Sequence, residues 1–279
     1  MTETAKTLML LAALGGLLVL AGWAAAGIPG AVLALILAAA ALSTVYFKAD
    51  HWALRASGAE PLEPGAHPRL QLALERLSVR AGVPTPRLYR IPSAACNAFS
   101  VGRDPSRAVI ALTDGLLARL PQRELEGVLA HELSHIRYRD SLTVSVVVAL
   151  ALALTGVAAW TAWIGGDEDQ DAPGPLFLLL APLAALLVQL GISREREYAA
   201  DADAARLTAD PEGLARALEL LGRADGTRAP YTRRPATASL YIVAPACTPR
   251  ALRWFSTHPP LEERVTRLRR MALGGYPQL

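Results

Sequence analysis

Long uncharged apolar runs alternate with charged blocks along the chain. No charged residue occurs in 7–47, and a Gly-Ile-Pro-Gly sequence at 27–30 divides this stretch into residues 7–26 and 31–47. A helix that crosses a bilayer needs roughly 17 to 25 apolar residues, and a Pro/Gly turn suits a tight helical hairpin. We therefore predict that residues 1–47 form a transmembrane hairpin.

A second pair of uncharged runs occupies residues 141–164 and 175–192, on either side of a polar tip at 165–174. These runs predict a second transmembrane hairpin over residues 141–192. The alternatives are a buried core hairpin of a soluble domain for this pair, and a cleaved signal peptide for the first run. The length of the runs argues against the former, and the immediate succession of two spans argues against the latter. The pattern thus predicts four transmembrane helices.

The basic residues indicate how these helices are oriented. Of the 28 Lys and Arg residues, Lys6 precedes the first run, 13 lie within 48–139, and 14 lie within 194–270. The polar tip at 165–174 has none and carries acidic residues instead. Because basic residues concentrate on the cytoplasmic side of membrane proteins, we expect both hairpin tips outside. Both charged blocks and both termini are then expected in the cytoplasm, at the inner or plasma membrane of the cell.

The composition agrees with a membrane protein and gives no sign of a nucleic-acid partner. Hydrophobic residues make up 52% of the 279 residues and charged residues only 19%. The net charge of +3 arises from basic residues interleaved with acidic ones, without a Lys/Arg run or an aromatic platform. We therefore expect contact with anionic lipid headgroups of the bilayer and no nucleic acid. Cys96 and Cys247 form no disulfide framework, which suits a reducing compartment.

The first charged block, residues 48–140, has the pattern of one half of an α+β domain. Apolar residues at helical spacing predict a helix at 68–81 that stops at Gly82. Three short strands bounded by prolines or turns are predicted at 87–91, at 107–112 and, as an edge strand, at 97–102. A helical pattern returns from Gln122 onward, and no stop signal precedes the second hairpin.

The helix that begins near Gln122 carries a His-Glu-x-x-His motif at His131, Glu132 and His135. The i, i+4 spacing places both imidazoles on one helix face, where they can hold a zinc ion with Glu132 beside its water. The structural alternative is a pair of surface histidines on a helix next to the membrane. A glutamate between two histidines at this spacing favours the metal site. A catalytic zinc ion also needs a third protein ligand and a position left to water.

Candidates for the third ligand are few. Acidic residues cluster directly after the last apolar run, at 193–201, and His258 is the remaining histidine of interest. Glu197 and Asp201 lie one turn apart in a helical pattern, so one can bind zinc while the other orients a ligand. The two cytoplasmic ends of the second hairpin must lie close together, which brings 193–201 near the motif. On residue chemistry alone Glu197 is favoured, with His258 as ligand or a salt-bridged helix without metal as alternatives.

Four segments together resemble the HtpX family of membrane-integral zinc metalloproteases, which is itself similar to the eukaryotic CAAX prenyl proteases. They are 97–102 (Asn-Ala-Phe-Ser-Val-Gly), 131–135 followed by Arg139-Asp140, 193–201 (Ser-Arg-Glu-Arg-Glu-Tyr-Ala-Ala-Asp) and 256–264 (Ser-Thr-His-Pro-Pro-Leu-Glu-Glu-Arg). The resemblance implies one Zn²⁺ per chain, with Glu197 as third ligand and Asp201 as a supporting acid in the second shell. It demotes His258 as a ligand and leaves Arg264 as a weak candidate for any catalytic role.

The resemblance also implies roles in substrate binding. The segment that contains Asn97 and Phe99 would be an edge strand lining the cleft, where an extended peptide can add by main-chain hydrogen bonds. His258 would lie near the cleft and stabilise the oxyanion, with a helix-capping or purely structural role as the alternative. Ser100 and Val101 stand where Ala and Thr are usual in the family, which leaves the substrate preference open.

These observations predict an integral membrane protein that is mainly α-helical with a small β-sheet. Four transmembrane helices in two hairpins would carry a cytoplasmic α+β zincin-like (gluzincin) catalytic domain, whose halves are 48–140 and 193–279. As a zinc endopeptidase it would use Glu132 to take a proton from the attacking water and return it to the leaving amine. Membrane proteins or their cytoplasmic segments are the expected substrates, in HtpX-like protein quality control. The alternatives are a CAAX-type prenyl protease, a regulatory protease and a noncatalytic membrane scaffold.

Overall fold

The computed structural model describes residues 3–63, 65–141, 145, 194–224, 242 and 259–274. The elements in chain order are α1 (Glu3–Ser57), β1 (Glu60–Pro61), α2 (Pro68–Ala81), β2 (Arg87–Ile91), β3 (Ala98–Val101), a 3₁₀ turn (Pro105–Arg107), β4 (Val109–Thr113), α3 (Asp114–Arg119), α4 (Gln122–Arg137), α7 (Arg194–Thr208), α8 (Pro211–Ala224) and α9 (Leu261–Ala272). The second predicted hairpin lies outside the described residues apart from Ser141 and Ser145, and so does His258.

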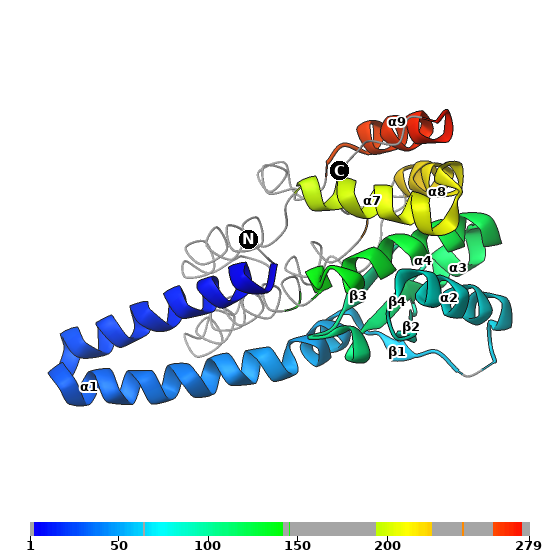
Figure 1. The fold of residues 1–279 in the computed structure, drawn as a ribbon. Coiled ribbons are helices and arrows are strands. Elements are labelled where there is room, and N and C mark those ends of the chain that lie inside the picture. The colour runs from blue at the N-terminus through cyan, green and yellow to red at the C-terminus, as the bar shows by residue number, and fades with distance from the viewer. Residues whose placement is uncertain are drawn as a thin grey trace, which may run out of the picture.

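α1 is a helical hairpin whose two halves run back alongside each other (Figure 1). The backbone leaves helical geometry at Ala26 (φ −145°, ψ 22°) and at Gly27 (φ 61°, ψ −145°). A positive φ is adopted readily only without a Cβ, which explains the glycine at this turn. The division predicted at 27–30 is therefore confirmed, and the second half continues past residue 47 to Ser57.

No helix in the described part of the chain is both long and apolar enough to cross a bilayer. The four transmembrane helices stay a prediction.

Four strands form one small mixed sheet in the order β1-β2-β4-β3. β2 and β4 are parallel, whereas β1 and β3 pair antiparallel with them at the two edges. Ile110 and Leu112 of β4 pack in the core shared with α2 and α4, whereas Val109 and Ala111 pack against Leu54 at the end of α1. Both faces of the sheet are thus covered, and every residue of β4 is buried. β3 is the edge strand that the sequence predicted.

Several predicted elements are confirmed, and their limits show where local patterns fail. α2 spans the predicted residues 68–81 and ends at Gly82 with a φ of 69°, and β2 has its predicted bounds. β4 begins later than predicted because Pro105–Arg107 forms a 3₁₀ turn. α4 ends at Arg137, and the chain turns through Arg139 at a φ of 62°. A helix stop that uses a non-glycine residue in this conformation carries no glycine signal in the sequence.

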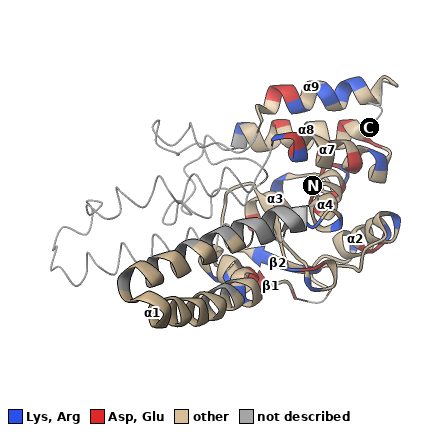
Figure 2. Cartoon of the chain, turned by 60° about the vertical axis from the view of Figure 1, so that its left-hand side comes forward, with Lys and Arg blue, Asp and Glu red and all other residues tan. Residues whose placement is uncertain are grey.

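α4 is the central helix of the domain and packs against α2, β3, α7 and α8. α7, α8 and α9 form a layer on the side of α4 away from α2 (Figure 1). Gly127 allows α8 to come close, because a Cβ at this position would lie 2.8 Å from the backbone N of Leu214. Acidic and basic residues are frequent along α8 and α9, whereas they are few along the described part of the α1 hairpin (Figure 2). The helix that carries the His-Glu-x-x-His motif is therefore held from several sides.

Candidate metal centre

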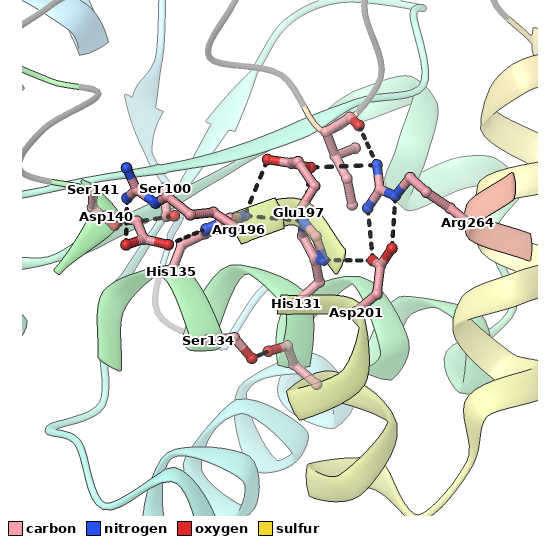
Figure 3. Close-up of polar contacts among 12 residues, drawn as sticks. Ser100, His131, Ser134, His135, Asp140, Ser141, Arg196, Glu197, Asp201 and Arg264 are labelled. Atoms are coloured by element: carbon pink, nitrogen blue, oxygen red, sulfur yellow. Dashed lines mark hydrogen bonds and ion pairs between the residues drawn. The ribbon is translucent and has the colours of Figure 1, made fainter. Parts of the chain in front are cut away.

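α4 and α7 bring three potential metal ligands together. His131 and His135 lie one turn apart on α4, and Glu197 at the start of α7 faces them (Figure 3). The two Nε2 atoms are 3.1 Å apart, and oxygens of Glu197 lie 3.8 Å from His131 Nε2 and 3.6 Å from His135 Nε2. One ligand atom from each residue lies within 4.8 Å of the others. The side chains of His131 and Glu197 are 1% and 4% exposed, so the cluster is buried.

The spacing and the chemistry of this cluster fit a zinc ion. Ligand bonds of about 2.0 to 2.2 Å in tetrahedral geometry place neighbouring donor atoms about 3.3 Å apart, which is near the separations observed here. Two imidazole nitrogens and one carboxylate oxygen are also a donor set typical of catalytic zinc, with the fourth position left for water or substrate. A carboxylate facing two imidazoles in a buried space is stabilised by a positive charge between them.

A carboxylate holds the other ring nitrogen of each histidine. His131 Nδ1 lies 3.0 Å from Asp201 Oδ1, and His135 Nδ1 lies 3.0 Å from Asp140 Oδ2. A proton on Nδ1, held toward the carboxylate, leaves Nε2 as the electron-pair donor that faces the cluster. Both imidazoles are therefore held in the orientation that metal binding needs.

Each of these carboxylates is held in turn by an arginine. Arg264 of α9 donates Nε and Nη2 to the two oxygens of Asp201 at 2.8 and 2.7 Å, and Arg196 of α7 forms an ion pair with Asp140. Each histidine is thus backed by a His–Asp–Arg chain (Figure 3). Because Asp140 precedes the second predicted hairpin and Arg196 follows it, their ion pair joins the two ends of residues 141–193 at this centre.

The surroundings of His135 favour a positive charge in the cluster. Burial lowers the pKa of His135, but the hydrogen bond to Asp140 and the charges of Glu197, Asp140 and Glu132 raise it to about 9. Burial would raise the pKa of Asp140, but the hydrogen bond and charge of His135 and the pairing with Arg196 hold it below its usual range. In the metal-free protein His135 is therefore protonated at neutral pH, and a bound cation would replace that proton.

Glu132 lies beside the three candidate ligands. The residue is 3% exposed, and its charge acts on both His135 and Arg264. A carboxylate in this position can take a proton from a water molecule held by a metal and pass it to a leaving group. The motif therefore supplies two ligands and a base from one helix.

The residues predicted to bind substrate lie at β3, with their side chains turned into the protein. Asn97 and Phe99 are 1% and 0% exposed. The Asn97 side chain accepts a hydrogen bond from Ala98 N–H at 3.1 Å, and Phe99 packs in the core beneath the end of α1. These two side chains are therefore part of the packing that supports the strand.

The predicted residues of the motif and of α7 form one cluster, namely His131, Glu132, His135, Glu197 and Asp201. Sequence reasoning missed the role of Asp140, although its place five residues after His135, just beyond the motif helix, was an available signal. Arg264, expected to matter little, is 0% exposed and anchors Asp201. The available signal was helical spacing, which puts Arg264 on the same face of α9 as Leu268 and Met271, whereas the other arginines of this helix are exposed.

The fold and the site together are those of a metallopeptidase, with a His-Glu-x-x-His helix packed on a small sheet and an acidic ligand on a later helix. The model of peptidase family M48 matches residues 64–272. A protein named protease HtpX homolog from Acidiphilium cryptum (strain JF-5) is 47% identical over 283 residues, which cover 98% of each chain. The protease HtpX homolog of Syntrophobacter fumaroxidans is 42% identical over 95% of this chain and 98% of its own. The chain belongs to peptidase family M48 and is a metallopeptidase.

The similarity in fold extends to a more distant solved structure. The crystal structure of S. mikatae Ste24p matches 95% of this chain with a TM-score of 0.51 and 22% sequence identity. The match covers 65% of the Ste24p chain, so this chain spans less than two thirds of that structure. The relatives confirm the resemblance to HtpX proteases seen in the sequence, and the predicted mainly helical fold with a small β-sheet is confirmed.

Proposed function

We propose that this chain is a zinc-dependent endopeptidase. The observation that carries this proposal is the buried cluster of His131, His135 and Glu197, with Glu132 beside it. The three ligand residues would hold one zinc ion per chain and leave one position open. When bound, zinc would polarise the scissile carbonyl and make an attacking water more acidic.

Residues of the chain itself would transfer the proton, orient the ligands and stabilise the oxyanion. Glu132 accepts the proton of the attacking water and delivers it to the leaving amine. Asp201 and Asp140 keep the two histidines in position, as the 3.0 Å contacts to their Nδ1 atoms support. His258 is proposed as a second catalytic residue that stabilises the oxyanion, on the basis of the HtpX-like segment in which it lies.

The outer edge of β3 is proposed to bind the substrate. An extended peptide can add to an exposed strand edge through main-chain hydrogen bonds, independently of most side chains. Asn97 and Phe99 would contribute by holding this strand in place, since both are buried. Such a site suits unfolded segments of many sequences, in agreement with a role in protein quality control.

We further propose that the enzyme is a multi-pass protein of the cell membrane, with its active site and both termini in the cytoplasm. Large apolar side chains on the α1 hairpin are exposed, among them Leu20 (63%), Trp23 (59%), Ile28 (75%) and Leu33 (58%). Burial of such a surface in lipid is favourable, and the distribution of Lys and Arg supports the orientation. Membrane proteins or their cytoplasmic segments are then the proposed substrates.

Replacement of the proposed base tests the catalytic assignment. Purified Glu132→Gln protein should retain zinc, because no ligand is changed, and should lose at least about 100-fold in hydrolysis of an unfolded substrate. Glu126→Gln is the matched control, since Glu126 lies on the same helix and pairs with Arg76 at the surface. Peptidase activity retained by Glu132→Gln, or unmodified protein that binds no zinc, would refute the proposal.

The topology is tested by labelling from outside the cell. A single cysteine at Asp169, in a chain whose Cys96 and Cys247 are replaced by serine, should react with a membrane-impermeant reagent added to intact cells. A cysteine at Arg270 should react only after the cells are opened. Labelling of both or of neither in intact cells would contradict the proposed orientation.

A further inference from the structure

Arg264 is a fully buried cation that contacts three residues, two of them on α7 and the third at position 242. Its Nε and Nη2 donate to Asp201 at 2.8 and 2.7 Å, and its Nη1 donates to the carbonyl oxygen of Ile242 at 3.0 Å. The same Nη1 lies 3.5 Å from Glu197 Oε2. Burial of a guanidinium costs free energy that an apolar side chain of similar volume would not. These contacts therefore indicate a role beyond packing.

Ile242 lies between Arg264 and the edge of the sheet. Its carbonyl accepts a hydrogen bond from Arg264, and its N–H donates to the carbonyl of Ala98 on β3 at 3.0 Å. The residue is 3% exposed and packs in the main core. Arg264 is thus linked through a single residue to the strand that we propose for peptide binding.

The register of β3 shows which of its main-chain groups face outward. The N–H of Thr113 donates to the carbonyl of Asn97, and such bonded pairs alternate along antiparallel strands. Positions 97, 99 and 101 therefore bond to β4, whereas positions 98, 100 and 102 face away from it. The contact between Ile242 and Ala98 agrees with this assignment.

Several of these outward groups already have partners. The N–H of Ala98 donates to the Asn97 side chain at 3.1 Å, and the N–H of Gly102 donates to Ser145 Oγ at 3.3 Å. Among the residues that the structure describes, none bonds the main-chain N–H or C=O of Ser100. Ser100 is itself only 6% exposed, but among the described positions of β3 it is the one that leaves both outward main-chain groups for a peptide.

We infer that Arg264 is a positioning residue that couples the metal ligands to the outer edge of β3, the edge that does not pair with β4. On one side it holds Asp201 and lies against Glu197, and on the other it holds Ile242 and through it the strand. A peptide paired with Ser100 is then kept in register with the metal centre. This inference rests on the proposed peptidase function and adds a link between the metal centre and the peptide-binding strand.

Arg264→Lys tests the coupling, with Arg270→Lys as the matched control on an exposed face of the same helix. Lysine keeps the charge but cannot bond Asp201 with two donors while also reaching Ile242. We expect the dissociation constant for zinc, measured against a competing chelator in detergent, to rise about tenfold. The KM for an unstructured peptide should rise about fivefold in the zinc-loaded variant. Arg270→Lys should change neither.

The outcomes separate coupling from a purely structural role. A change in zinc affinity alone, a change in KM alone, or a lower thermal midpoint with both constants unchanged would overturn the inference. Should Arg264→Lys not fold, Ile242→Pro decides, because it removes the N–H given to Ala98 but keeps the carbonyl given to Arg264. That variant should raise KM about fivefold without a change in zinc affinity, and an unchanged KM would overturn the inference. Unmodified protein without zinc or peptidase activity would instead overturn the proposed function.

Discussion

Replacement of Asp140 by asparagine should weaken zinc binding without removing any ligand. Asp140 Oδ2 lies 3.0 Å from His135 Nδ1, and its side chain is 6% exposed and paired with Arg196. Asparagine keeps the size and an acceptor oxygen but loses the negative charge. The imidazole is then less basic and less firmly oriented, so its Nε2 is a weaker ligand.

The expected loss of zinc affinity follows from the role of Asp140 as a support for His135. Loss of a group that supports a metal-bound histidine costs 10- to 100-fold in affinity, or about 1.4 to 2.7 kcal/mol. Because asparagine retains an acceptor at the same position, we expect the lower end of this range, about tenfold, for zinc binding to the unprotonated His135 imidazole. Asp203→Asn is a matched control: Asp203 is 7% exposed and paired with Arg137 at 3.2 Å, and its oxygens bond no histidine in the described part of the chain. It should change zinc affinity by less than about twofold, since an exposed arginine partner limits the loss.

The assay is zinc competition with a chromophoric chelator in detergent, with Glu132→Gln as the background so that no proteolysis occurs. Measuring zinc affinity at two pH values distinguishes a less basic His135 from a general disturbance of the site. The pKa of His135 is raised to about 9 in the metal-free protein, so zinc competes with a proton at pH 7. Asp140→Asn lowers that pKa and reduces the competition, so the loss of affinity should be larger above about pH 9 than at pH 7. An unchanged affinity above about pH 9, or an equal loss there in Asp203→Asn, would refute the reasoning.

Three further predictions concern packing, substrate pairing and acid stability. Gly127→Ala should lower the thermal midpoint of the zinc-free protein. Alanine gains about 1 kcal/mol in helix propensity, but its methyl group would lie 2.8 Å from the backbone of Leu214, which costs about 1 to 3 kcal/mol. A raised thermal midpoint would contradict this. Ser100→Pro removes an outward N–H and should raise KM about fivefold, whereas Ser100→Ala should not; equal KM values would exclude main-chain pairing at this position. The hydrogen bond from Arg123 lowers the pKa of Asp210. The pair therefore stabilises the fold at pH values above the ordinary carboxyl pKa, and this stabilisation is lost as the pH falls through the lowered pKa of Asp210. Urea unfolding of Arg123→Met should therefore differ from that of the unmodified protein at neutral pH and converge with it in acid, and a constant difference would be inconsistent with this.

Elements with strong local signals were predicted closely, and those that depend on distant contacts were not. α2 has a clear apolar period and a glycine at its end, and both of its bounds agree with the sequence. The third candidate ligand, Glu197, was also found in advance, because acidic residues one turn apart stand where the chain must return to the motif. By contrast, α4 ends at Arg137 through a turn at Arg139. An arginine with a positive φ is stabilised by its surroundings and not by its own conformational preference.

The sequence by itself determined the alternation of apolar runs and charged blocks, the break at Gly27, and the His-Glu-x-x-His motif at His131, Glu132 and His135. These features depend on residue type and short-range spacing, which chain geometry turns directly into a helical face or a turn. Only the tertiary structure decided that Asp140 supports a histidine and that one arginine of α9, Arg264, is buried against Asp201. A charged side chain becomes part of a site when packing removes it from water beside an opposite charge, and no short segment of sequence records that event.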